Sequence, residues 1–152
     1  MVAAAHSTTI HRPVEEVFAY VTNTGNDPAW HTDVLDAHKK TDGPIGIGTV
    51  WTSRFKPSMG ISEGEMEVIE FEPGRKEVMR GEVGPMQPTL TYLFEPSEGG
   101  TRFTRHVQIK ISGMMKVMTP VMSIMTKRSN RDFLANLKRV LEQQASDRSA
   151  RG

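Results

Sequence analysis

The first part of the chain is predicted to form a strand followed by an amphipathic helix. Residues 2–11 favour the strand. After Pro13, apolar residues recur at a spacing of three and four positions, as on one face of a helix: Val14, Val17, Phe18 and Val21. Proline fits the first turn of a helix, where its missing N–H costs nothing, and we expect Gly25 to end this one.

A second, short helix is expected next. Asn26 or Asp27 can cap it, because both side chains accept hydrogen bonds from the free N–H groups of a first helical turn. Pro28 suits its first turn, and Trp30 would lie on its inner face.

Alternation of apolar and polar residues predicts strands through the middle of the chain. The pattern recurs in five further stretches, which glycine- and proline-containing turns separate: 49–55, 65–70, 75–84, 90–94 and 102–111. Gly99-Gly100 is a candidate hairpin turn. These stretches and the first strand make six, and we expect about seven strands in all. Their short connections favour antiparallel pairing because parallel strands need longer crossovers.

From Gly113 onward the period becomes helical. The apolar stripe of this last helix consists of Met115, Met118, Met122, Met125, Phe133, Leu137, Val140 and Leu141. Pro120 cannot lie inside a helix without a kink. Either the long helix begins near Thr119, with Thr119 as its cap, or a short helix precedes it, and the first arrangement is favoured.

The order of these elements leaves the sheet with one large uncovered face. The last helix carries the longest apolar stripe, and the inner face of the sheet is the surface that can receive it. We therefore expect an α+β fold with a single domain over residues 1–145, in which a curved antiparallel sheet wraps around the C-terminal helix. Residues 146–152 are expected to form a flexible tail.

Composition narrows the possible functions. The chain has 152 residues, no cysteine and a net charge of +1, so it has no disulfide framework, thiolate metal site or cysteine nucleophile, and no electrostatic reason to bind nucleic acid. Acidic residues cluster mid-chain and basic residues near the end, and both groups are interpreted as solvated faces: Glu63, Glu65, Glu67, Glu70, Glu72 and Glu77, and Lys127, Arg128, Arg131, Lys138 and Arg139.

We expect a cytoplasmic protein without a membrane span, a metal site or a cofactor. No stretch approaches the about 20 apolar residues that a spanning helix needs, and the first residues lack the features of a signal peptide. His6 and His11 would face opposite sides of a strand and cannot share a metal. Gly46 and Gly48 lie between strands rather than at the start of a helix, so they do not form a phosphate loop.

Several short segments, in a fixed order over nearly the whole chain, carry a resemblance to a known family: residues 11–21, Trp30, 46–49, 68–73, 100–102 and 136–142. In their order and spacing the chain resembles the START-like, or SRPBCC, superfamily, and within it the polyketide cyclase/dehydrase type. The resemblance implies a helix-grip fold, in which a seven-stranded sheet grips the C-terminal helix around a cavity for lipids, sterols, polyketides or other apolar ligands. The superfamily has no universal catalytic motif, so the resemblance assigns no catalytic residue.

The expected cavity is lined by aromatic residues and methionines. Ten methionines are many for this length, and methionine adapts to irregular space, so those of the last helix are interpreted as a deformable wall, with ordinary core packing as the alternative. The predicted lining is Trp30, Trp51, Phe55, Met66, Val68, Met79, Tyr92, Phe94, Arg105, Val107, Met118, Met122 and Met125.

Arg105 has the most specific chemistry among these residues. It shares a strand face with Phe103 and Val107, which is predicted to point inward, and a buried guanidinium must be paired or must bind an anion. It would hold a carboxylate, phosphate or enolate oxygen of a ligand; the alternatives are a salt bridge at the cavity mouth or a bulge that turns it outward. Tyr92 and His31 are weaker candidates for catalysis, and His31 is better explained as a solvated loop residue beside acidic neighbours.

Three functions follow, in decreasing order of support. The first is a binding or carrier protein for an apolar small molecule. The second is a cofactor-independent cyclase or dehydratase, in which Arg105, Tyr92 or His31 would polarise a carbonyl or move a proton. The third is a module that binds a protein partner through its acidic strands or basic helix. The ligand is not identified by the sequence, and a homodimer stays open.

Overall fold

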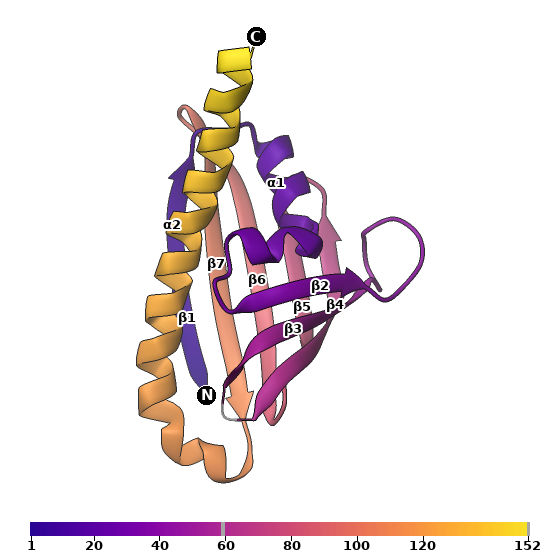
Figure 1. The fold of residues 1–152 in the computed structure, drawn as a ribbon, viewed down its shortest axis with the longest axis vertical. Coiled ribbons are helices and arrows are strands. Elements are labelled where there is room, and N and C mark those ends of the chain that lie inside the picture. The colour runs from indigo at the N-terminus through magenta and orange to yellow at the C-terminus, as the bar shows by residue number, and fades with distance from the viewer. Residues whose placement is uncertain (59, 152) are drawn as a thin grey trace.

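The computed structural model describes residues 1–58 and 60–151 (Figure 1). In chain order the elements are β1 (Val2–Ile10), α1 (Val14–Thr22), the 3₁₀ helix η1 (Thr24–Ala29), β2 (Val34–Lys39), β3 (Val50–Ser58), β4 (Ile61–Glu72), β5 (Lys76–Glu82), β6 (Met86–Ser97), β7 (Gly100–Ile111), the 3₁₀ helix η2 (Gly113–Met118) and α2 (Thr119–Arg151).

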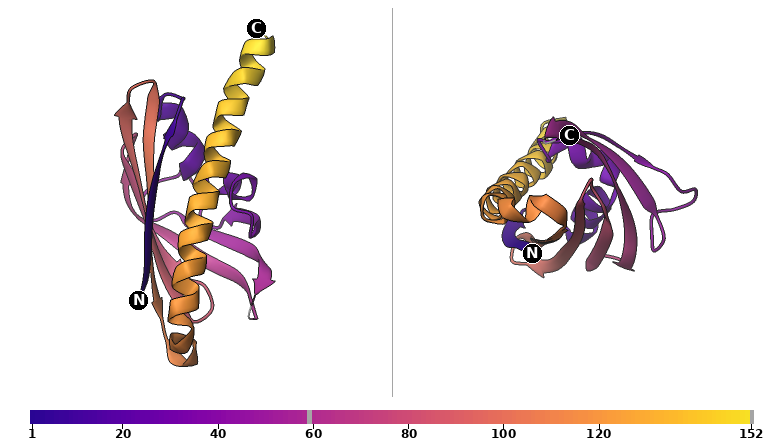
Figure 2. Two further views of the ribbon diagram at one scale, coloured as in Figure 1. Left: turned by 90° about the vertical axis from the view of Figure 1, so that its left-hand side faces the viewer. Right: turned by 90° about the horizontal axis from the view of Figure 1, so that it is seen from below.

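Seven strands form one antiparallel sheet in the order β1-β7-β6-β5-β4-β3-β2. Strands β2 to β7 follow one another as a meander, and β1 pairs with β7, so the first and last strands are neighbours. The sheet curls, and α2 lies along its open side while α1 and η1 cover the remaining inner surface (Figure 2). This arrangement confirms the predicted seven-stranded helix-grip fold.

Helix α2 lies beside β1 and runs in the same direction. Met122, near its start, packs in one cluster with Val2. Further along, the Lys138 ammonium group donates to the Thr9 carbonyl oxygen at 2.5 Å, and Arg12 donates from Nη1 to the Leu141 carbonyl oxygen at 2.7 Å. Because contacts recur along the length of β1, the helix is held to this edge of the sheet.

The main core lies between the sheet, α1, η1 and the second half of α2. Aromatic rings from α1, β6, β7 and the residue that follows η1 meet in it: Phe18, Trp30, Phe94 and Phe103 are each 7% exposed or less. Phe18 and Phe94 pack edge to face, with ring centroids 5.0 Å apart. From α2 the core receives Phe133, Leu134, Leu137 and Leu141.

The β6–β7 hairpin turns at Gly99, as the sequence predicts. Gly99 has a φ of 80°, which a glycine adopts without steric cost. At Gly100 a Cβ atom would lie 2.1 Å from the Ile10 carbonyl oxygen, so this position needs glycine because β1 passes so close.

The sequence pattern did not predict strand β2. Of its six residues only Val34 is buried, because β2 forms the edge of the sheet and its side chains mostly face solvent. The apolar alternation on which strand prediction depends is therefore absent here.

The boundaries of the first two helices differ from the prediction. Helix α1 ends at Thr22 rather than at Gly25, and η1 begins at Thr24. Asn23 caps η1, because its Oδ1 accepts a hydrogen bond from the Gly25 N–H at 3.1 Å. Asn26 and Asp27, the predicted caps, lie inside η1 instead.

The start of the long helix combines both predicted arrangements. Helix α2 begins at Thr119, and the short helix η2 precedes it. The Thr119 hydroxyl does not cap α2 in the predicted manner, because it donates to the Lys116 carbonyl oxygen at 2.7 Å. The helix continues to Arg151, into the residues predicted as a tail, of which Gly152 lies outside the described residues. None of the described helices combines the length and the apolar character that crossing a membrane requires.

Candidate functional site

A cavity of about 180 Å³ lies between the sheet, η1 and α2. Its wall is mostly apolar: Val34, Phe55, Met66, Met79, Val83, Met86, Pro88, Leu90, Val107, Ile109 and Phe133. Its polar residues are Thr24, Asp27, His31, Asp33, Ser53 and Arg105. Four of these six come from η1 and the residues just after it, so the polar groups gather near one element.

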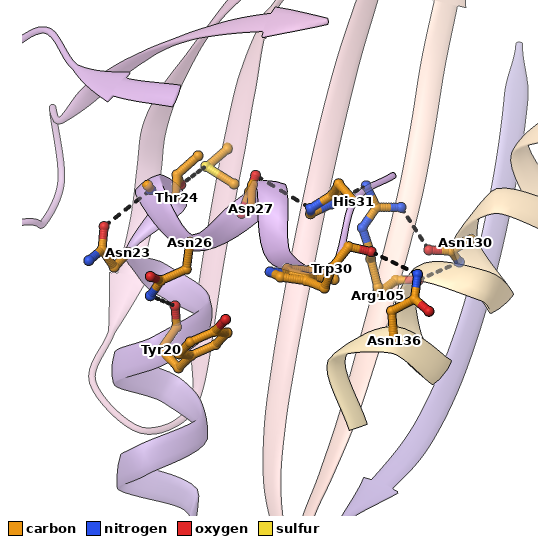
Figure 3. Close-up of polar contacts among 12 residues, drawn as sticks. Tyr20, Asn23, Thr24, Asn26, Asp27, Trp30, His31, Arg105, Asn130 and Asn136 are labelled. Atoms are coloured by element: carbon orange, nitrogen blue, oxygen red, sulfur yellow. Dashed lines mark hydrogen bonds and ion pairs between the residues drawn. The ribbon is translucent and has the colours of Figure 1, made fainter. Parts of the chain in front are cut away.

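Arg105 projects from β7 into the cavity and is 7% exposed. Its Nη1 donates to Oδ1 of Asn130, on α2, at 2.7 Å, and its Nη2 lies 3.4 Å from Nε2 of His31 (Figure 3). Asn130 is oriented in turn by its Nδ2, which donates to the Arg105 carbonyl oxygen at 3.1 Å. Because a guanidinium only donates, His31 Nε2 must accept, which leaves the imidazole proton on Nδ1.

No carboxylate among the described residues lies within ion-pair distance of the Arg105 guanidinium, and its Nε has no hydrogen-bond partner there. Its Cζ instead lies 5.4 Å from the centroid of the Phe133 ring and 6.0 Å from that of Tyr92. Aromatic faces attract a cation only modestly. Arg105 therefore carries a positive charge in a low-dielectric site whose hydrogen-bonded partners are neutral.

Asp27 and His31 form a second polar pair beside Arg105. The backbone N–H of His31 donates to the backbone carbonyl oxygen of Asp27 at 2.7 Å. Between the side chains, His31 Nδ1 lies 3.7 Å from Asp27 Oδ2. Burial, together with the nearby Arg105 charge, holds the pKa of His31 well below its usual value. Burial also raises the pKa of Asp27 well above its usual value, although Arg105 opposes this shift. The site thus favours a neutral imidazole, and burial opposes ionisation of the Asp27 carboxyl group.

Glu77 is fully buried, so its interpretation as part of a solvated acidic face is wrong. It lies on β5 directly opposite Tyr92 of β6, and neither of its carboxyl oxygens has a hydrogen-bond partner among the described residues. Burial, and then the charge of Asp27, raises its pKa to about 8. The signal was present in the sequence, because Glu77 and Met79 share a strand face and Met79 was already predicted to point inward.

Tyr92 is buried beside Arg105 but does not line the cavity. The two residues are cross-strand partners, and the Tyr92 hydroxyl has no hydrogen-bond partner within the described part of the chain. Burial raises the pKa of Tyr92 above its usual value, so the phenol stays protonated.

Ten of the thirteen predicted lining residues divide into two groups. Phe55, Met66, Met79, Arg105 and Val107 line the cavity. A second group lies in the packed core around it: Trp30, Trp51, Val68, Tyr92 and Phe94. His31, predicted to be solvated, is 4% exposed and lines the cavity. It lies just after η1, in contact with Arg105 and with the ring of Trp30.

The methionines of the last helix do not form the predicted wall. Met122 and Met118 pack with Val2 and Ile111 in a separate cluster, and Met125 is 58% exposed. The reason is the position of α2 beside β1, which directs the first half of its apolar stripe to the edge of the sheet. From α2 the cavity receives Phe133, and Asn130 lies one helical turn before it.

Asp27, Asn130 and Phe133 were not predicted as site residues. Asn130 carried a usable signal, because it is a polar residue three positions before Phe133 on a stripe that must be buried. Among the described residues, no three His, Asp or Glu side chains are arranged to hold a metal ion.

A family profile described as "Polyketide cyclase / dehydrase and lipid transport" matches residues 1–142. The comparison with curated proteins gives no match.

Solved structures share the fold at low sequence identity. A START superfamily protein from Mycobacterium smegmatis is 10% identical, with a TM-score of 0.79 over 93% of this chain and 98% of that chain. The di-domain ARO/CYC BexL from the BE-7585A biosynthetic pathway is 18% identical, with a TM-score of 0.74 over 93% of this chain and 47% of that chain. A protein from Deinococcus radiodurans is 21% identical, with a TM-score of 0.68 over 96% of this chain and 99% of that chain. Because the family profile covers nearly the full length, the chain belongs to the polyketide cyclase/dehydrase and lipid transport family.

Proposed function

We propose that the protein binds an apolar small molecule that carries one anionic or strongly polarised oxygen. The observation that carries this proposal is the buried Arg105, which lines a mostly apolar cavity and has no carboxylate within ion-pair distance among the described residues. A buried cation without a directly bound counter-charge is costly, and a ligand carboxylate or enolate would offset that cost. The name of the family, which includes lipid transport, supports an apolar ligand.

The volume of the cavity bears on the size of the ligand. At about 180 Å³ it is slightly larger than the engineered cavities of about 150 Å³ that hold one benzene molecule. A compact aromatic acid or a short acyl chain fits inside. A longer molecule would extend outward past Asp33, an exposed residue of the lining.

The test compares two probes that differ mainly in charge, 4-ethylbenzoate and 4-ethylbenzamide. Each is titrated into the protein and followed by NMR chemical shifts. We expect the carboxylate to bind about tenfold more tightly than the amide, because a charge-assisted hydrogen bond to a buried guanidinium is stronger than a neutral one. Arg105→Met should remove this preference and leave the binding of the amide.

The matched control is Arg102→Met, which removes an exposed arginine from the same strand. It should retain the preference for the carboxylate. Equal binding of both probes by the unmodified protein would refute the proposal, and so would a preference that survives in Arg105→Met. Retained binding of the amide by Arg105→Met also shows that this variant is folded.

A cyclase or dehydratase is the second candidate, and the contact between His31 and Arg105 at the cavity favours it. If a ligand oxygen replaced His31 as the partner of Arg105 Nη2, the freed His31 Nε2 could take a proton from a carbon between two carbonyls while Arg105 stabilises the enolate oxygen. The enolate carbon would then attack a second carbonyl of the same molecule, and the proton would return to the new alkoxide. Turnover of a poly-β-ketone that His31→Gln and Arg105→Met both abolish would support this reaction. Turnover by both variants at the rate of the unmodified protein would exclude these roles.

A further inference from the structure

Five large apolar side chains project into solvent where the sheet passes into α2. They lie on η2 and the first turns of α2 and range from 49% to 91% exposed: Met114, Val117, Val121, Ile124 and Met125. Met114, Val117, Val121 and Ile124 recur every three to four residues, and Met125 adjoins Ile124. From here on, the apolar stripe means this exposed set of five residues, not the largely buried face of α2 that the sequence pattern predicts. Contiguous exposed apolar surface of this kind marks an interaction site more often than scattered single residues do.

Only basic charges accompany the apolar stripe along the chain. Residues 99–131 contain no aspartate or glutamate. Lys116, Lys127 and Arg128 adjoin the stripe in sequence, and Lys110 lines the same depression as Lys116. None of these four cations makes an ion pair with a described residue. Their charges are therefore available to an external anionic partner.

The apolar stripe lies at one end of the molecule. In Figure 1, η2 forms the lowest point of the ribbon, beyond the ends of the strands. Met1, which is 71% exposed, borders the same surface, because it lines a shallow depression together with Lys110 and Lys116. The end of the molecule thus presents apolar side chains surrounded by cations on a protruding segment rather than in a groove.

We propose that this end of the protein binds the surface of an anionic lipid bilayer. The apolar stripe would enter the boundary between headgroups and acyl chains, and the four cations would contact lipid phosphates. A planar, negatively charged surface fits a protruding apolar segment with basic residues around it. A second copy of this chain would instead have to supply a complementary groove.

The inner side of η2 connects this surface with the cavity. Met115 and Met118 pack in one cluster with Met86 and Ile109, and the latter two line the cavity. The segment that would contact lipid is therefore separated from the proposed ligand site by one layer of side chains. Binding to a bilayer does not depend on what the cavity holds, so the two proposals can fail independently.

The test is co-sedimentation with vesicles of phosphatidylcholine alone and of phosphatidylcholine mixed with phosphatidylglycerol. We expect the protein to bind the mixed vesicles, and to bind them less tightly as salt rises. Ile124→Asp should weaken this binding about tenfold, since it places a charge where an apolar side chain would be buried. Ile124 is exposed, so the variant should keep the melting temperature of the parent.

The matched control is Ile47→Asp, which alters an exposed isoleucine on the β2–β3 connection. It should bind mixed vesicles as the parent does. A double charge reversal, Lys127→Glu with Arg128→Glu, should weaken binding to mixed vesicles while leaving the apolar stripe intact.

Three results would overturn the proposal. The first is no binding of the parent protein to mixed vesicles. The second is an equal loss of binding in Ile47→Asp and Ile124→Asp. The third is a dimer that Ile124→Asp dissociates without any vesicle binding by the parent, because the apolar stripe would then be the contact between two copies of the chain.

Discussion

At the scale of single residues, Glu77 places a carboxyl group on the inner face of the sheet, where it has no hydrogen-bond partner among the described residues. Its pKa of about 8 lies above the usual 4.5, so the folded state binds its proton more tightly than the unfolded state does. The stability that this protonation contributes is fully present below the unfolded pKa. It is lost as pH rises through the folded pKa.

Replacing Glu77 with glutamine should therefore change the pH dependence of stability. Glu77→Gln should match the parent near pH 5 and be more stable near pH 9, by a few kcal/mol at about 1.4 kcal/mol per pKa unit. Urea unfolding at a series of pH values measures this difference. As a control, Glu67→Gln changes an exposed carboxylate and should leave the pH profile unchanged. A constant difference between Glu77→Gln and the parent at all pH values would contradict the assignment.

Strand periodicity predicts which face of the sheet a side chain occupies, but not which groups it contacts. Alternation along β7 correctly places Arg105 on the inner face, since its neighbours on that face are apolar. The contacts of its guanidinium come from elements far away in sequence. His31 is 74 residues from Arg105 and Asn130 is 25 residues away, so only the tertiary arrangement brings these groups together.

At the scale of elements, prediction succeeds where a face is buried along its whole length. The strands that cross the middle of the sheet and the start of α2 were found because burial imposes a clear period. Strand β2 was missed because it is an edge strand. The direction of the methionine stripe of α2 was wrong because its period defines a face of the helix but not the strand against which that face packs.

The pairing of β4 with β5 depends on a glycine. A Cβ atom at Gly81 would lie 1.8 Å from the Glu65 carbonyl oxygen, which is backbone and cannot move aside without separating the two strands. Gly81→Ala should lower the free energy of unfolding by about 3 kcal/mol or more. Urea denaturation measures this change.

Gly46→Ala is the matched control for that substitution. Among the described residues, and apart from its two chain neighbours, no atom lies within 4 Å of the position that a Cβ atom would take at Gly46, and its φ is not positive. We expect it to change the free energy of unfolding by less than about 1 kcal/mol. Equal destabilisation by Gly81→Ala and Gly46→Ala would mean that the close approach of β4 and β5 does not limit this position.

At the scale of the whole molecule, the fold is closed by contacts between the two ends of the chain. Strand β1 pairs with β7, and α2 packs against β1. The contacts that join the sheet to α2 therefore need both the first and the last segments of the chain. Such long-range contacts make folding slow and cooperative, because loop closure must precede the gain from packing. The cavity depends on the same closure, since one of its walls comes from α2.

This dependence predicts a sharp boundary for the domain along α2. A chain that ends at residue 132 lacks the four α2 side chains in the main core, which are each 6% exposed or less: Phe133, Leu134, Leu137 and Leu141. Burial of a large apolar side chain contributes about 1.5–3 kcal/mol, so losing all four is comparable with the whole stability of about 5–15 kcal/mol of a typical domain. This chain should not fold.

A chain that ends at residue 145 should melt within a few degrees of the parent, as circular dichroism can measure. Leu141 is the last buried side chain among the described residues, and the first two removed, Ser146 and Asp147, are exposed. A large fall in melting temperature for this chain would show that the end of α2 supports the fold. Cooperative melting of the chain that ends at residue 132 would show that the sheet folds without α2, and the cavity would then have to be attributed to the sheet, α1 and η1 alone.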